Sequence, residues 1–354
     1  MKSNFFKKIS LAVLIAFTVN FYTVNAGIIV ASHWLNPETG QNVYIYSDKH
    51  DIYSDEQTKY LINLLKEKTN SNLIIFIESY ILSDKEIETT NNNELKILKE
   101  TNNVIIQSLK KYFKKQSLLR NLYDLINSSK IQIETCETRG IPFLMGHYIR
   151  KYDAVKSNKY NATELNENEY QKLLKTLDLI QETFKEFTLQ RILKKFLNFL
   201  QKQIKIHESN NELVYLIYTE KNEIEKNAIN LFKKYNLSDD NIKKDFYIDL
   251  MISKIKINKN YQNFTKEFKS LFNLSVDIKT LINIIDNPKK DIAIFVGAGH
   301  GLNIEASLEY LGFKLKKEMN RENLEIIKKQ DYDNYDKLNK FCNTNVFNWM
   351  FEEN

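Results

Sequence analysis

The 354-residue chain has little cysteine, with only Cys136 and Cys342. Two cysteines are too few for a small scaffold held together by disulfides. In an exported chain the two thiols could form one bridge, although each also fits as a small buried apolar side chain. The composition, with 43% hydrophobic and 27% charged residues, is that of an ordinary globular protein with a sizeable core.

Long apolar runs are absent beyond the first 26 residues. Within that leader, three lysines precede an apolar run over residues 9–22, and Val24-Asn25-Ala26 then precedes Gly27. This order is typical of an export signal cleaved before Gly27. The run is shorter than the roughly 20 residues that cross a bilayer, which disfavours an uncleaved anchor. We therefore expect a signal peptide over residues 1–26, no membrane span after its removal, and a protein that is periplasmic, in the cell envelope or secreted.

A strong excess of charge of one sign is also absent. The formal charge is +6, and three of the lysines lie in the leader, which has no acidic residue, so residues 27–354 carry +3. Proteins that bind nucleic acid are usually far more basic than this. The charge therefore argues against nucleic acid as a partner.

Five short segments, some of them apolar runs and some rich in β-branched or aromatic residues, predict the strands of an α/β core. They lie at residues 43–46, 73–77, 131–135, 292–296 and 313–315. The segment before the first run contains His33 and Trp34, and we interpret it as a loop. Helical spacing of apolar residues just after His50 predicts a crossover helix between the first two strands, which makes them parallel. We expect a mixed, mainly parallel sheet flanked by helices.

Strand signals are nearly absent from residues 159–287. Apolar residues instead step by four and three, from Leu173 to Phe187 and again from Ile224 to Tyr235. This predicts a large, mostly helical insertion between an N-terminal part of the core and a C-terminal part. Such stripes are typical of a seam between helices; a ligand groove or partner surface is the alternative. The expected divisions are residues 27–158, 159–287 and 288–354, and the apolar segment 347–351 is expected to dock on the core.

A glycine turn with a histidine follows the predicted strand at residues 292–296. Gly297 and Gly299 allow a tight exit, and His300 lands at the carboxyl end of the strand, where open α/β sheets bind ligands. Gly312 is expected to end the helix that follows, in a left-handed conformation. The turn lacks the third glycine of a dinucleotide fingerprint at its usual spacing and the Lys-Ser/Thr of a phosphate loop, which disfavours a nucleotide site. The alternative role for His300 is to cap the helix.

Three side chains that could bind a metal are expected at one edge of this sheet. His50 and Glu78 follow the first two strands, and His300 follows the late strand. Two imidazoles and one carboxylate form a usual first shell for a catalytic divalent ion, with positions left open for water and substrate. Such an ion activates water and polarises a carbonyl, which is the chemistry of metal-assisted hydrolysis.

These residues carry a resemblance to a known family. Residues 27–80 and 290–317 resemble the two ends of the TraB/GumN/TIKI group, within the superfamily that includes erythromycin-esterase-like and ChaN-like proteins. That group has a Gly-x-x-His after its first strand, a glutamate after its second, and a late Gly-x-x-His followed by a helix and a Gly-aromatic step. The matching segments are Gly297-Ala298-Gly299-His300, Gly312-Phe313, and Glu78 in Ile-Phe-Ile-Glu-Ser; the first motif keeps His50 but has Ser47 in place of its glycine.

The resemblance implies an exported metal-dependent hydrolase, a peptidase or an esterase, that acts on a peptide or a small ester or amide. It implies that His50, Glu78 and His300 bind a divalent ion such as Mn, Co or Zn. The alternative is a non-catalytic exported binding or effector protein on a hydrolase-like scaffold. Ser47 and the long insertion favour the alternative, and the presence of all three ligands favours the enzyme.

Other polar residues are weaker candidates. Asp48 or Asp51 could orient the His50 imidazole, and Arg139, just beyond the third strand, could bind an anionic substrate group or a reaction oxyanion. A surface role is the simpler interpretation of each. His147 has no partner at metal-ligand spacing and is expected to be packed or at the surface, and His207, among lysines near a helix end, is expected to face solvent.

Overall fold

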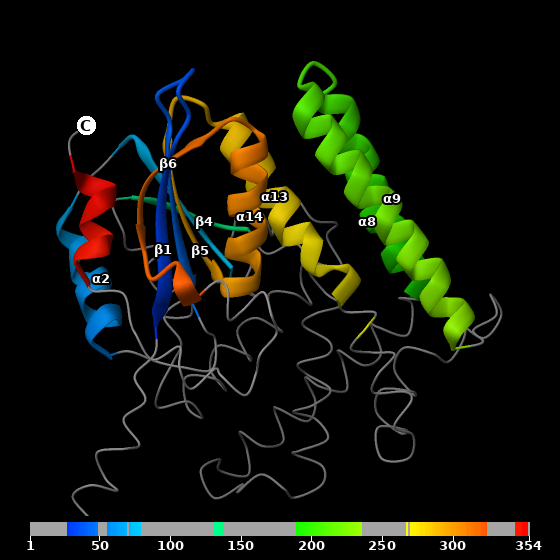
Figure 1. The fold of residues 1–354 in the computed structure, drawn as a ribbon, viewed down its shortest axis with the longest axis horizontal. Coiled ribbons are helices and arrows are strands. Elements are labelled where there is room, and N and C mark those ends of the chain that lie inside the picture. The colour runs from blue at the N-terminus through cyan, green and yellow to red at the C-terminus, as the bar shows by residue number, and fades with distance from the viewer. Residues whose placement is uncertain are drawn as a thin grey trace, which may run out of the picture.

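The computed structural model describes residues 27–48, 55–68, 71–78, 131–136, 189–235, 267, 270–323 and 344–352. In these residues the chain forms a six-stranded sheet with helices on both faces (Figure 1). The strands are β1 (Ile28–Leu35), β2 (Asn42–Asp48), β3 (Leu73–Ile77), β4 (Gln132–Thr135), β5 (Asp291–Gly297) and β6 (Lys314–Met319). The helices are α2 (Asp55–Glu67), α8 (Leu189–Ile206), α9 (Asn211–Lys234), α13 (Asn273–Asp286), α14 (Ala298–Tyr310) and the 3-10 helix η3 (Thr344–Phe351).

The strand order is β4-β3-β5-β2-β1-β6. β4, β3, β5 and β2 run parallel, β1 pairs antiparallel with β2, and β6 pairs antiparallel with β1 at the edge of the sheet. The predicted α/β class with a mixed, mainly parallel sheet is therefore confirmed. β2 and β3 are parallel as expected, and β5 lies between them and pairs with both. This central position brings the start of α14 to the carboxyl ends of β2 and β3.

The interpretation of the first segment as a loop was wrong, because residues 28–35 form β1. β1 pairs with β2 through the turn at Asn36, which is closed by a hydrogen bond from the Gly40 amide to the Asn36 carbonyl. Polar side chains interrupt its apolar pattern and are buried with specific partners. Ser32 donates to Glu305 of α14 at 2.5 Å, and the His33 ring is hydrogen-bonded to Asn42 at 2.8 Å. These partners lie elsewhere in the sequence, so local pattern concealed the strand.

The sheet separates two apolar clusters, and alternate residues of each central strand point to opposite faces. In β3, Ile74 and Phe76 pack with α13 and α14, whereas Leu73, Ile75 and Ile77 pack with α2 and η3. We call these the α14 face and the α2 face. Burial on both faces explains why these strands appear in the sequence as continuous apolar runs.

The helices of the predicted insertion lie on the α14 face, with α8 and α9 outside α13 (Figure 1). Asn210 caps α9 by accepting a hydrogen bond from the Leu213 amide at 2.9 Å. Ile224, Ala228 and Leu231 of the predicted stripe are buried, as a seam between helices requires. Residues 173–187 of the other stripe lie outside the described part of the chain.

The expectation that His207 faces solvent was wrong. Its side chain is buried just after α8, and Nε2 lies 3.6 Å from Asp286 Oδ1 at the end of α13. The turn between α8 and α9 places the imidazole against the end of α13. The lysines near His207 in the sequence gave no indication of this contact.

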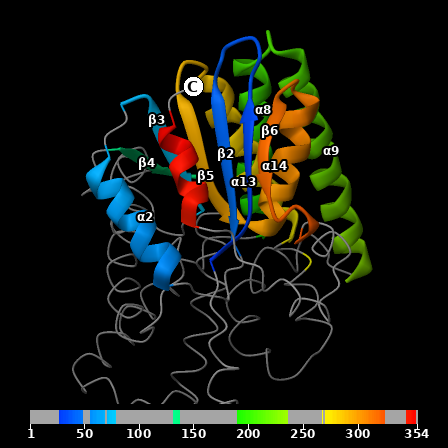
Figure 2. The same ribbon diagram turned by 60° about the vertical axis from the view of Figure 1, so that its left-hand side comes forward.

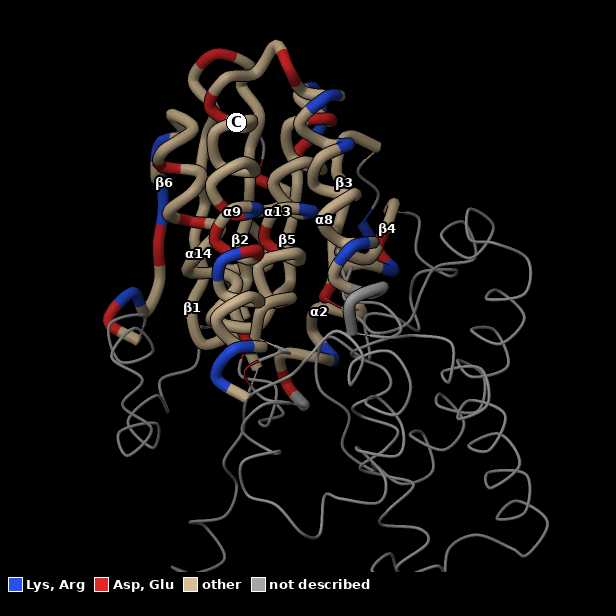
Figure 3. Tube along the Cα trace, turned by 90° about the vertical axis from the view of Figure 1, so that its right-hand side faces the viewer, with Lys and Arg blue, Asp and Glu red and all other residues tan. Residues whose placement is uncertain are grey.

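The C-terminal segment covers the α2 face, as its apolar sequence predicted (Figure 2). Val346, Phe347 and Met350 of η3 are buried, and Tyr46 donates a hydrogen bond to the Val346 carbonyl at 2.9 Å. At the open edge of the sheet, β6 is exposed and rich in lysine (Figure 3). A charged edge strand discourages pairing with another sheet.

Two smaller expectations concern cysteine and membrane spans. Cys136, just after β4, is buried, and Cys342 lies outside the described residues. Among the helices that the structure describes, none has the length and apolar character needed to cross a bilayer.

Candidate metal centre

Glu78 follows β3 directly and its side chain is almost completely buried, with 2% exposed. It continues the alternation of Ile74 and Phe76, which directs it to the α14 face. Its Oε2 accepts a hydrogen bond from the Gly297 amide at 2.8 Å, at the N-terminus of α14. A carboxylate is favoured there because the unpaired amides and the helix dipole present positive charge. Glu78 therefore fixes the junction between β5 and α14.

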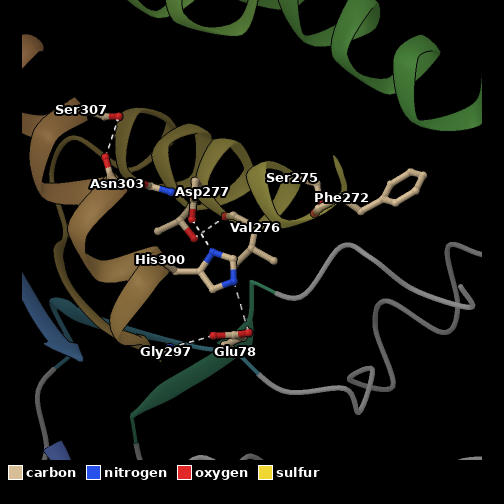
Figure 4. Close-up of polar contacts among 10 residues, drawn as sticks. Glu78, Phe272, Ser275, Val276, Asp277, Gly297, His300, Asn303 and Ser307 are labelled. Atoms are coloured by element: carbon tan, nitrogen blue, oxygen red, sulfur yellow. Dashed lines mark hydrogen bonds and ion pairs between the residues drawn. The ribbon is translucent and has the colours of Figure 1, made fainter. Parts of the chain in front are cut away.

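His300 lies in the first turn of α14 with its ring between two carboxylates (Figure 4). Its Nδ1 is 2.6 Å from Asp277 Oδ1 on α13, and its Nε2 is 3.5 Å from Glu78 Oε1. The side chain is 11% exposed. Gly297, at the N-cap, makes no side-chain cap hydrogen bond, and the carboxylate of Glu78 binds the amide there instead. The structure therefore brings together two of the three predicted ligands.

Asp277 is the residue that the sequence analysis missed. It lies on the buried side of α13, and both of its oxygens have partners: Oδ1 binds His300, and Oδ2 accepts from Asn303 Nδ2 at 2.8 Å. Burial raises the pKa of the Asp277 carboxyl, the hydrogen bonds from His300 and Asn303 oppose that rise, and the nearby charge of Glu78 adds to it. The sequence feature that could have identified Asp277 is one acidic residue among the buried apolar residues of this helix.

A further carboxyl group approaches from α9. Burial raises the pKa of Glu220 to about 7, and the charges of Glu223 and Asp277 act in the same direction. Its Oε2 is buried and has no hydrogen-bond partner in the part of the chain that the structure describes. Glu220 therefore adds negative potential behind Asp277 when it ionises.

The separation of Glu78 and His300 is close to that of two ligands of one metal ion and slightly longer than a usual hydrogen bond. An N–H···O hydrogen bond spans about 2.7–3.2 Å, and Nε2 and Oε1 are 3.5 Å apart. Two ligand atoms, each about 2.1 Å from a zinc-like ion at the tetrahedral angle, lie about 3.4 Å from one another. The Nδ1 contact with Asp277 is also the usual arrangement of a metal-binding histidine, whose second nitrogen donates to a carboxylate.

Asp277 cannot be the third ligand of the same ion, because it lies on the opposite side of the imidazole from Glu78 (Figure 4). Accordingly, no group of three or more His, Cys, Asp or Glu side chains in the described ranges is arranged to hold a metal. A complete shell requires a further ligand, and His50 is the candidate from sequence.

His50, Asp51, Arg139 and His147 all lie outside the described residues, so their predicted roles stay predictions. Asp48, the last residue of β2, is buried and pairs in register with Gly297. By alternation it lies on the same face as Tyr44 and Tyr46, the α2 face. Among the described residues, Asp277 is the carboxylate that contacts His300 Nδ1, and the role of Asp48 toward His50 stays a prediction.

Ser47, which stands where the group that the sequence resembles has a glycine, packs against a glycine on the facing helix. A Cβ on Gly301 would lie 1.9 Å from Ser47 Oγ and 3.2 Å from Ser47 Cβ. α14 can pack on β2 next to His300 only because residue 301 has no side chain. The close packing that a glycine at position 47 would allow is thus made possible by Gly301 of α14 instead.

Comparison of the chain with protein-family models, curated proteins and solved structures finds no match in any of the three.

Proposed function

We propose that this protein is an exported metal-dependent hydrolase whose metal is bound by Glu78, His300 and His50. The observation that carries the proposal is that Glu78 Oε1 and His300 Nε2 face one another at 3.5 Å, which is close to the spacing of two ligands of one ion. The resemblance to the TraB/GumN/TIKI group supports the same set of ligands.

The residues of the chain would each hold one part of the centre in place. Glu78 presents Oε1 while the Gly297 amide holds Oε2, so its carboxylate cannot rotate freely. His300 presents Nε2 while Asp277 binds Nδ1. Both side chains are largely buried, which limits access of water and strengthens their electrostatic interactions. His50 would supply the third ligand.

The chemistry that a divalent ion supplies when bound is Lewis-acid polarisation of a carbonyl and a lower pKa for water. Hydrolysis of a peptide, or of a small ester or amide, is the class of reaction that this chemistry serves.

The test is metal binding by the full chain. Zn²⁺, Co²⁺ and Mn²⁺ are titrated in turn, and the visible spectrum of the Co²⁺ form reports coordination geometry. We expect one ion per chain, and we expect Glu78→Gln and His300→Ala to weaken binding by more than about 100-fold, since loss of a ligand should exceed the 10–100-fold effect of losing an outer partner. Hydrolysis of a panel of esters and peptides should be lost with the metal.

His207→Gln is the matched control, because it removes a buried histidine that lies on the same side of the sheet as His300. It should change neither metal binding nor hydrolysis. If the wild-type chain binds none of the three ions, the enzyme is refuted and the non-catalytic scaffold is favoured, with Glu78 serving only to bind the α14 N-terminus.

A further inference from the structure

Asp277 and Asn303 form a hydrogen-bonded pair behind His300. Asn303 and His300 are three residues apart on α14, so their side chains lie on one side of that helix. Both point to Asp277 on α13 (Figure 4), which accepts from Asn303 Nδ2 at 2.8 Å and lies 2.6 Å from His300 Nδ1. One carboxylate is thus held by two side chains of the neighbouring helix.

The partners of Asp277 determine which imidazole nitrogen carries the proton. When Asp277 is ionised it only accepts hydrogen bonds, so Nδ1 donates to Oδ1 at this distance; burial raises the pKa of Asp277, and the hydrogen bond from Asn303 to Oδ2 favours the ionised form. In the neutral ring the other nitrogen, Nε2, then has a lone pair and no proton. Nε2 lies 3.5 Å from Glu78 Oε1.

We propose that Asp277, held by Asn303, is a positioning residue that keeps His300 as the Nδ1–H tautomer, with the Nε2 lone pair facing Glu78. The inference rests on the proposed function, because this tautomer matters if His300 binds a metal through the lone pair of Nε2. It assigns to α13, in the predicted insertion, a direct part in organising the site.

The test reads the tautomer in the metal-free protein. The full chain is labelled with ¹⁵N-histidine, stripped with a chelator and held at pH 8, and the His300 signals are assigned by comparison with His300→Gln. The two nitrogens of a neutral imidazole have well-separated ¹⁵N shifts according to which is protonated. We expect Nδ1 to be protonated in the wild type.

Two variants separate positioning from a general structural role. In Asp277→Asn the new amide can present either its oxygen or its NH₂ group to His300, so we expect the Nε2–H tautomer to gain population. When Asp277→Asn is combined with Asn303→Asp, the new carboxylate at position 303 accepts from the NH₂ group at position 277 and directs the oxygen of that same amide back to Nδ1. We expect this double variant, which restores the net charge, to restore the Nδ1–H tautomer.

Zinc affinity of the same proteins gives the second readout. It should fall about 10–100-fold in Asp277→Asn and recover in the double variant. A wild-type ring that is mainly Nε2–H, or a tautomer population unchanged in Asp277→Asn, overturns the positioning role even if zinc binds. The predicted tautomer together with no zinc binding refutes the proposed function and leaves the positioning role standing.

Discussion

The buried His33 and the largely buried His300 lie on opposite faces of the same sheet, and their partners differ in charge. His33 of β1 stacks on Tyr44, which belongs to the α2 face, and its Nε2 is hydrogen-bonded to the neutral amide of Asn42. His300 lies on the α14 face between the carboxylates of Asp277 and Glu78. Burial alone therefore does not distinguish a structural histidine from a candidate ligand.

The difference shows how the partner sets the chemistry of a buried imidazole. Burial lowers the pKa of His33, and the hydrogen bond to Asn42 only partly opposes it, so the neutral ring is the stable form there. The His33 Nδ1 is buried and has no hydrogen-bond partner in the described segments. At His300 both nitrogens face carboxylate oxygens, which is an arrangement that accepts positive charge, whether a proton or a metal ion.

The largest effect is expected on the α2 face. Phe347→Ala removes a completely buried ring that packs against Tyr46, Tyr60 and Phe295. The free energy of unfolding should fall by about 3–5 kcal/mol, because a large cavity opens in the core. Phe347 lies on the α2 face, whereas the proposed ligands Glu78 and His300 lie on the α14 face. Zinc affinity, measured at a temperature where the variant is still folded, should therefore not change.

Phe347→Leu is the matched control and should cost less than about 1.5 kcal/mol, since it keeps most of the apolar volume. A loss of zinc affinity in Phe347→Ala as large as that of Glu78→Gln would contradict the separation of the two faces.

A smaller effect is expected where α14 packs on β2. Gly301→Ala places a methyl group against Ser47, whose Oγ and Cβ lie 1.9 and 3.2 Å from the new carbon. Overpacking costs about 1–3 kcal/mol and the better helix propensity of alanine returns about 1 kcal/mol, so we expect a net loss of about 1 kcal/mol in denaturant unfolding. Because His300 precedes this residue, zinc affinity should fall as well, unlike in Phe347→Ala.

The double variant Ser47→Gly with Gly301→Ala completes a double-mutant cycle. Removing the Ser47 side chain makes room for the methyl group, so the coupling energy should be favourable, by about 1 kcal/mol. Additive effects of the two changes would show that this contact does not position α14.

The smallest effect concerns His33 and depends on pH. Its pKa is lowered by burial, so the unfolded chain binds a proton at a higher pH than the folded protein does. The stability that the fold has with a neutral His33 is fully present above about pH 6.5. It is lost as the pH falls toward the lowered pKa of the folded state, with a slope of at most about 1.4 kcal/mol per pH unit. Urea unfolding between pH 8 and 5 measures it.

His33→Gln should flatten that part of the profile, because glutamine does not titrate. Identical slopes for the wild type and His33→Gln would show that His33 is not held neutral by its surroundings and would weaken the contrast with His300.

Local information in the sequence determined much of the fold. The apolar runs of β2, β3, β4 and β5 and the helical spacing in α2, α9 and α14 depend on residues within a few positions of each other. Gly312 has φ of 86°, the left-handed conformation expected at the end of α14. The placement of Glu78 and His300 near one edge also followed from strand direction, because the carboxyl ends of parallel strands meet there.

Tertiary structure decided what depends on partners far apart in the chain. In β1, Glu305 and Asn42 are the partners of the buried Ser32 hydroxyl and His33 Nε2, and β5 separates β2 from β3, which no local pattern predicts. Asp277 reaches His300, which lies 23 residues later in the sequence, only because α13 packs across α14. Hydrophobic periodicity specifies which side of a helix is buried, but the burial of a charge depends on the neighbour that compensates it, and that neighbour is set by packing.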